Sequence, residues 1–322
     1  MRAIDKASSV SKEAERIHKS ASGSQELWPG LPYEEWKDTY DTVHMWTQIV
    51  GKIRLTLSPE VNHWWHSALY VTPRGLTTSP IPYGTRTFEI QFDFTGHNLS
   101  IQTSDGMTRY MGLYPRTVAD FYQELMAILA SMGLGVKINP MPQEVANPIR
   151  CDQDHEHAAY DELYIERFRR ILVQTDHIFK MFRGRFIGKC SPVHFWWGGF
   201  DLAVTRFSGR LAPERPGATL IDREAYSHEC SSVGFWPGSG GLLKPAFYAY
   251  TAPAPIGYDG APVQPENAYY DSSLGDFLLL YDDFRTAEQP AEMLLDFLQS
   301  TYEAGANLAK WDRGSLERNL KE

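Results

Sequence analysis

The amino-acid sequence predicts an α+β fold in which a unit of helix, antiparallel strands and helix occurs twice, the two units forming a pseudo-two-fold pair. The first observation is a repeat. Residues 42–72 and 175–205 align without a gap at an offset of 133, with nine identical positions, where about two are expected by chance. The repeat makes His44 and His177 equivalent, and both are expected in buried helix contacts.

Hydrophobic periodicity is the second observation. Phe88, Ile90, Phe92 and Phe94 alternate with polar residues, which is the period-two signature of a half-buried strand. Apolar residues at three- and four-residue spacing predict helices. These helices are expected near residues 36–50, 118–129, 166–183 and 293–302.

The boundaries of the two units follow from composition. Residues 1–27 are rich in Ser, Lys and Glu and predict a flexible N-terminal arm. Residues 28–138 form the first α+β half, and the Pro-rich, acidic segment 139–160 forms a linker. Residues 161–322 form the second half, with an insertion near 207–245 that is rich in Gly, Pro, Arg and aromatic residues.

Charge and cysteine content exclude several functional classes. The 322 residues include 31 Lys+Arg and 40 Asp+Glu, a formal net charge of −9, and no long basic run that would attract nucleic acid. The three cysteines lack the spacing of a disulfide framework or a zinc ribbon. No segment approaches the ~18 apolar residues of a membrane span. The sequence therefore predicts a cytoplasmic protein with neither a nucleic acid nor a membrane as partner.

Histidines near the repeated motif are the main candidates for chemistry. His63 and His66 flank a tryptophan pair, His194 stands in the second copy, and His228 and Glu229 lie in the expected insertion. If the halves pack about a two-fold axis, these five residues could share a divalent metal, iron or zinc. His194, His228 and Glu229 would then be catalytic. The alternative is that the histidines belong to an aromatic core, with their ring nitrogens bonded to backbone groups.

Tryptophans and arginines complete the predicted site. A pocket wall is expected from Trp64, Trp65, Trp196, Trp197 and the loop residue Trp236, although packing in the core is the alternative. Guanidinium groups bind carboxylate or phosphate with two parallel hydrogen bonds. The arginines expected to hold an anionic substrate are Arg74, Arg206 and Arg210, with ion pairs to nearby carboxylates as the alternative.

The chain contains the long strings VNHWWH, YVTPRGLTTSPIPYG, FRGRFIGKCSPVHFWWG, FDLAVTRFSGR and REAYSHE. With these strings it resembles an uncharacterised family of bacterial proteins, found mainly in actinobacteria and proteobacteria. The resemblance spans about residues 28–311. It implies a discrete bacterial module, and it implies no activity, cofactor or catalytic residue.

Together these patterns predict a small-molecule enzyme of unknown reaction, with a pocket between the halves lined by tryptophan and histidine. The ligand is expected to be a small molecule with an anionic group, and the site is expected to be metal-dependent if the histidines converge. The alternative is a non-catalytic protein that binds a ligand or another protein. The sequence predicts no particular substrate or oligomeric state.

Overall fold

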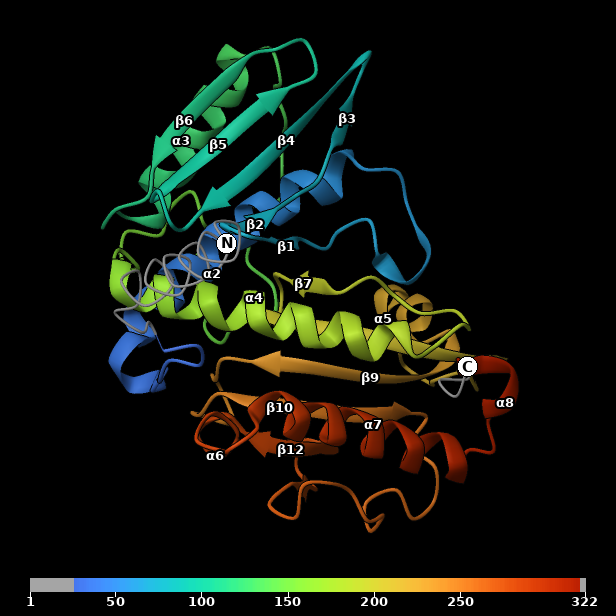
Figure 1. Ribbon diagram of the computed structural model, residues 1–322. Coiled ribbons are helices and arrows are strands. Elements are labelled where there is room, and N and C mark those ends of the chain that lie inside the picture. The colour runs from blue at the N-terminus through green and yellow to red at the C-terminus, as the bar shows by residue number, and fades with distance from the viewer. Residues whose placement is uncertain (1–25, 319–322) are drawn as a thin grey trace, which may run out of the picture.

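The computed structural model describes residues 26–318, and across them the chain forms two six-stranded antiparallel sheets with flanking helices (Figure 1). This architecture confirms the predicted α+β class. The expected N-terminal arm lies almost wholly outside the described residues. Within them, no helix has both the length and the apolar character that crossing a bilayer requires.

The elements follow the expected order of helix, strands and helix in each half. The first half comprises α2 (Tyr33–Leu57), η1 (Asn62–Trp64), β1 (Tyr70–Thr72), β2 (Gly75–Thr77), β3 (Ile81–Tyr83), β4 (Arg86–Asp93), β5 (Asn98–Thr103), β6 (Thr108–Gly112) and α3 (Val118–Ser131). The second comprises α4 (Glu162–Gly184), β7 (His194–Trp196), β8 (Asp201–Leu211), α5 (Leu220–Ala225), β9 (His228–Trp236), β10 (Ala246–Ala252), β11 (Tyr269–Asp271), β12 (Asp276–Leu280), α6 (Tyr281–Arg285), α7 (Pro290–Leu308) and α8 (Arg313–Leu316).

The first sheet packs one face against helices α2 and α3. Its strands pair in the order β1, β2, β4, β5 and β6, with β3 also paired to β4. The predicted alternation in β4 is confirmed, since Phe88, Ile90 and Phe92 are buried while the residues between them are not. Phe121 of α3 stacks on Trp46 of α2, with ring centroids 4.7 Å apart. The aromatic face of β4 thus meets an aromatic helix pair.

The second sheet has one face against the long helices α4 and α7, and an opposite face that only the short helix α5 approaches. Its strands pair in the order β11, β12, β10, β9, β8 and β7. Val204, Val233 and Phe247 are fully buried on the face that packs against α4 and α7 (Figure 1). Because side chains alternate along a strand, the neighbouring residues of the same three strands point to the opposite face. That opposite face forms the floor of the site described below.

The two halves are joined where their first strands meet. Leu69, beside β1, and Phe195 of β7 exchange backbone hydrogen bonds of 2.9 and 2.8 Å. The indole Nε1 of Trp197 donates to the carbonyl oxygen of Ser67 at 2.8 Å. A Cβ at Gly51 would lie 2.2 Å from the Trp197 ring, so α2 needs a glycine there for the indole to pack against it.

The predicted duplication agrees with the order of elements, but individual repeat positions differ. Residues 194–196 form strand β7, whereas the aligned residues 61–63 lead into the turn η1. His44 is buried and His177 is exposed, so the expectation of a buried His177 is wrong, because α4 turns that position to solvent. The expected insertion near 207–245 contains β9, which lies inside the sheet between β8 and β10. Duplication of the two halves stays a prediction.

Candidate functional site

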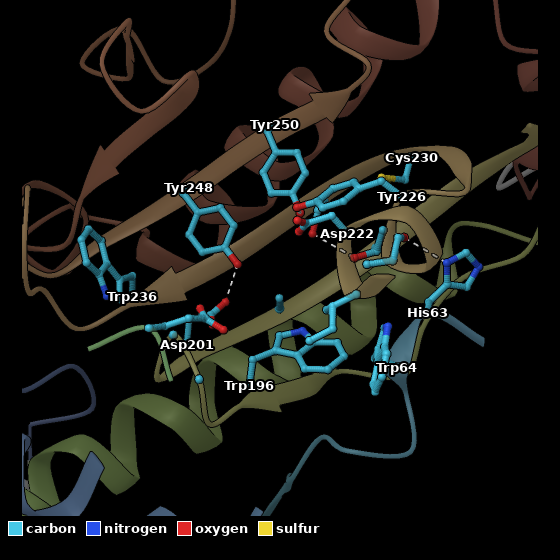
Figure 2. A pocket seen from close by; sticks show the side chains of 18 of the residues that line it. His63, Trp64, Trp196, Asp201, Asp222, Tyr226, Cys230, Trp236, Tyr248 and Tyr250 are labelled. Atoms are coloured by element: carbon cyan, nitrogen blue, oxygen red, sulfur yellow. Dashed lines mark hydrogen bonds between the residues drawn. The ribbon is translucent and has the colours of Figure 1, made fainter. Parts of the chain in front are cut away.

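A cavity of about 680 Å³ lies on the face of the second sheet opposite α4 and α7 (Figure 2). Its floor is built from alternate residues of four neighbouring strands, which all point to this face. The floor residues are Asp201, Ala203, Thr205 and Phe207 of β8, Cys230, Ser232 and Trp236 of β9, Tyr248 and Tyr250 of β10, and Asp276 and Leu278 of β12.

The cover of the cavity comes from segments distant in sequence. It comprises η1 and the residue after it, helix α5, part of the linker (Gln143 and Glu144), and the turn 196–199 after β7. His63 and Trp64 have left-handed backbone conformations, with φ of 59° and 62°, which non-glycine residues seldom adopt. A hydrogen bond of 3.0 Å between His63 Nδ1 and the Ala225 carbonyl ties this strained turn to α5. Both halves and the linker therefore enclose the cavity.

Asp201 is one of two acids in the cavity with a strongly raised pKa. Its pKa is about 7, because burial and, to a smaller extent, the charge of Glu144 raise it by more than the hydrogen bond from Tyr248 lowers it. The Tyr248 hydroxyl donates to Asp201 Oδ2 at 2.5 Å (Figure 2). Asp276, on the same sheet face, also has its pKa raised to about 7, by burial and then by the charge of Asp271.

Two glycines bring the carboxylates of Asp201 and Glu144 to the same turn. A Cβ at Gly198 would lie 2.4 Å from Glu144 Oε1. A Cβ at Gly199 would lie 2.9 Å from Asp201 Oδ1 and 3.6 Å from Glu144 Oε2. Glu144 is exposed overall, but its carboxylate lies against the turn of Gly198 and Gly199. Burial of the carboxylate at this turn raises its pKa. Two carboxyl groups therefore lie near the same turn at one end of the cavity.

Tyrosines and a thiol occupy the other end of the floor. The hydroxyl oxygens of Tyr226 and Tyr250 lie 3.1 Å apart, and the rings of Tyr248 and Tyr250 are parallel at 6.2 Å. Burial raises the pKa of Cys230 to about 12. The Cys230 thiol therefore stays protonated at neutral pH and is a poor nucleophile.

Comparison with known proteins places the chain in a family but supplies no activity. A model of a family of unknown function, DUF5996, matches residues 28–318. The chain belongs to this family. No curated protein and no solved structure matches it. The function of this DUF5996 member therefore has to be inferred from the cavity itself.

The histidines predicted to share a metal in this DUF5996 chain do not converge. Among residues 26–318, no group of three or more His, Cys, Asp and Glu could hold a metal ion. Only the rings of His63 and His228 are neighbours, with centroids 5.7 Å apart. His66 accepts a hydrogen bond of 3.1 Å from the Val61 amide in its own turn. The expected convergence is therefore wrong.

The remaining two members of the predicted metal set are held elsewhere. His194 packs behind Trp65 and Trp196, with ring centroids 5.8 and 5.0 Å away. Burial, followed by the charge of Arg54, lowers the pKa of His194 to about 3. Glu229 follows His228 on β9 and points to the opposite face, where it pairs with Arg210 at 2.6 Å. Adjacent strand residues point to opposite faces, so His228 and Glu229 do not reach one site.

His63 is the predicted histidine that does reach the cavity. Its Nε2 lies 2.7 Å from the Lys189 ammonium, so the lone pair of Nε2 accepts from Lys189 while the Nδ1 proton goes to Ala225. Burial lowers the pKa of His63, and the charge of Lys189 lowers it further. His63 is therefore a neutral hydrogen-bonding group in the wall.

The tryptophans gather at the cavity. The lining includes all five that the sequence singled out, namely Trp64, Trp65, Trp196, Trp197 and Trp236. Trp197 is 5% exposed and mainly joins the halves, whereas the other four are partly exposed to the cavity. Trp64 has a buried indole Nε1 without a hydrogen-bond partner among the residues that the structure describes.

The predicted anion-binding arginines lie away from the cavity. Arg74 pairs with Asp93 of the first sheet at 2.6 Å, and Arg210 pairs with Glu229. Arg206 points to the helix-covered face, where its guanidinium lies over the Phe182 ring at 3.5 Å and donates to the Phe182 carbonyl near the C-terminal end of α4. A cation there is favourable because the helix dipole ends negative. The expected role of these arginines in holding a substrate is therefore not supported by their positions.

Proposed function

We propose that the chain is an enzyme that acts on a small molecule bound in this cavity, with Asp201 as the group that exchanges a proton with the substrate. The observation that carries the proposal is an acid with a pKa near 7 on the floor of a large, aromatic-walled cavity. Perturbed acids in clefts are typical of catalytic groups. An acid whose pKa is close to the ambient pH is available in both protonation states.

The neighbours of Asp201 suit this role. The hydrogen bond from Tyr248 fixes the orientation of the carboxyl group and stabilises its ionised form. Glu144 has the opposite effect, since its negative charge favours the protonated form. Partly exposed tryptophans would hold the body of the substrate against the sheet. No metal enters the proposal, because the five residues predicted to share one are dispersed.

A non-catalytic ligand-binding protein is the rival function, and the aromatic walls alone would suit it. The two functions separate in one experiment with the variant Asp201→Asn. Small metabolites would be screened for thermal stabilisation of the protein, and each hit would then be incubated with it and followed by NMR. Asp259→Asn serves as the control, because Asp259 is an exposed carboxylate outside the cavity.

An enzyme consumes at least one hit, with turnover retained by the Asp259→Asn protein and lost from the Asp201→Asn protein, which still binds. A hit that the wild-type protein binds without consuming it supports the rival function. Turnover that survives in the Asp201→Asn protein would remove Asp201 from the mechanism.

A further inference from the structure

Acidic side chains in the cavity differ from those elsewhere in their partners. Outside the cavity, three partly buried carboxylates each contact a basic side chain. These pairs are Asp93 with Arg74 at 2.6 Å, Glu166 with Arg169 at 2.6 Å and Asp176 with Lys180 at 2.5 Å. In the cavity, Glu144, Asp201 and Asp276 form no ion pair with any residue between 26 and 318.

The lining of the cavity contains no lysine or arginine in the described part of the chain. Three basic residues approach lining residues. Lys189 donates to His63 and lies over the rings of Trp65 and Phe207, Lys52 lies over Trp197 at 5.5 Å, and Arg215 lies over the Tyr226 ring at 4.1 Å. None of the three forms an ion pair with a carboxylate of the cavity, so these carboxylates have no basic partner among the described residues.

On the basis of the proposed function, we propose that the ligand of this cavity is an organic cation, an amine or a quaternary ammonium compound. The anion predicted from the arginines would meet only carboxylates and neutral groups here. A cationic nitrogen would instead lie between Asp201 and Glu144, at the turn of Gly198 and Gly199, and supply the missing charge.

Aromatic side chains next to the carboxylates strengthen the inference. Tyr248 donates to Asp201 and presents its ring to the cavity, and Trp196 and Trp236 line the same end (Figure 2). The faces of tryptophan and tyrosine rings carry partial negative charge and attract ammonium groups within about 6 Å. A neutral sugar would also stack on these rings, but it would leave the carboxylates of the cavity without a counter-charge.

The protonation state of Asp201 provides a second test, because cation binding should depend on pH. Its titratable neighbours are Tyr248 of β10, Glu144 of the linker, and Tyr40 and His44 of α2. Burial raises the pKa of both tyrosines and lowers that of His44 to about 4, so these three stay neutral near pH 7. Asp201, with a pKa of about 7, Glu144, and Asp222 of α5, whose charge acts on Glu144, therefore set the charge of this end. A cation binds best when Asp201 and Glu144 have lost their protons.

The test uses two sets of probes that match in shape and differ in charge. One set is choline, its neutral carbon isostere dimethylbutanol, and dimethylbutyrate. The other is tyramine, ethylphenol and hydroxyphenylpropionate. Binding to the full-length protein would be measured by calorimetry and ligand-detected NMR at about pH 6 and about pH 8. We expect the cation of at least one set to bind about 10-fold more tightly than its neutral partner at the higher pH, with a smaller preference at the lower pH.

Variants of cavity residues test whether the preference for the cation arises in the cavity. Asp201→Asn and, independently, Asp276→Asn should each reduce the preference for the cation, and Asp259→Asn should retain it. The second cavity variant keeps the test decisive if the first does not fold. Equal binding of cation and neutral isostere, tighter binding of the anion, or no binding of either cation at millimolar concentration would each overturn the inference.

The outcomes also separate this inference from the proposed function. Preferential binding of cations with no turnover of any bound molecule would support the inference and contradict the enzyme. Turnover of a neutral or anionic compound that depends on Asp201 would support the enzyme and contradict the inference.

Discussion

On the open face of the first sheet, Asp93 accepts two hydrogen bonds from Arg74, at 2.6 and 2.9 Å. On the cavity face of the second sheet, Asp201 has a tyrosine and a second carboxylate as neighbours. Both residues lie at one end of a strand in an antiparallel sheet whose other face is covered by helices. The comparison indicates that the first sheet is arranged for stability, and that the second carries a charge arrangement that lowers stability and suits a ligand.

The pKa values of the two aspartates diverge accordingly. Burial acts to raise the pKa of Asp93, but hydrogen bonds from Arg74 and from the amides of Gly96 and Thr95 outweigh it and hold the pKa below its ordinary value. Asp201 has only the Tyr248 hydroxyl and its own amide as donors, so burial prevails. For Asp93 the hydrogen bonds from Arg74 and two amides together outweigh burial, whereas for Asp201 burial outweighs the hydrogen bond from Tyr248.

The largest expected effect on stability concerns the contact that joins the two halves, because both sheets depend on it. Trp197→Ala removes a buried indole together with its hydrogen bond to Ser67, and the free energy of unfolding should fall by about 3–5 kcal/mol. Trp196→Ala is the matched control, because Trp196 is partly exposed in the cavity wall. Urea denaturation of both variants measures the difference. Equal losses would mean that Trp196 is as structural as its neighbour.

The next effect tests the comparison of aspartates directly. A carboxyl group with a raised folded-state pKa binds its proton more tightly when folded, so its contribution to stability is lost as pH rises from about 4 to about 7. Asp201→Asn should therefore stabilise the protein at about pH 8, on the order of 2–4 kcal/mol, and change little near pH 4. Thermal denaturation across this pH range measures it.

Asp93→Asn should behave in the opposite way. Because the pKa of Asp93 is lowered in the folded protein, its ionised carboxylate stabilises the fold at pH values above its unfolded-state pKa. This stabilisation is lost as the pH falls through the folded-state pKa. Because Arg74 is half exposed, the loss at neutral pH should be only about 1 kcal/mol. If Asp201→Asn destabilised the protein at about pH 8, as Asp93→Asn is expected to do, the contrast between the two sheets would be contradicted.

A smaller effect is expected from the tyrosine that moderates Asp201. Tyr248→Phe removes a hydrogen bond that lowers the pKa of Asp201, so that pKa should rise above about 7, and the pH midpoint of cation binding should rise with it. Tyr250→Phe is the control, since the Tyr250 hydroxyl bonds to Tyr226. The midpoint, followed by calorimetry across pH, should move in the first variant alone.

The smallest expected effect concerns the cavity thiol. With a pKa of about 12, Cys230 should react with iodoacetamide far more slowly than a free cysteine at neutral pH. Mass spectrometry of the labelled protein measures the rate. Rapid labelling of the folded protein would show that a base near Cys230 activates it.

Local patterns explain which features the sequence could predict. The alternation of Phe88, Ile90 and Phe92 reports directly on a sheet with one buried face, and three- and four-residue spacing predicted the helices α3 and α7. Trp64 and Trp196 stood out because tryptophan pairs are rare and occur in both copies of the motif.

The carboxylates of the cavity could not be predicted in the same way. Glu144, Asp201 and Asp276 come from the linker, β8 and β12, and the pairing of distant strands brings them together. The polar residues at alternate positions in β10, Tyr248 and Tyr250, were the signal that a sheet face was neither core nor plain surface. The prediction that His228 and Glu229 share one site is wrong for a local reason, because adjacent strand residues point to opposite faces of the sheet.

The cover of the cavity also has a consequence for synthesis of the protein on the ribosome. Trp64 and Trp65 belong to the cover, whereas the floor ends at Leu278, more than two hundred residues later in translation. At a translation rate of about 5–20 residues per second, roughly 10–40 s pass between the synthesis of these tryptophans and the synthesis of the last floor residue. During that interval the nascent chain carries an exposed aromatic turn, so the segment around residues 62–66 is where a chaperone would be expected to bind.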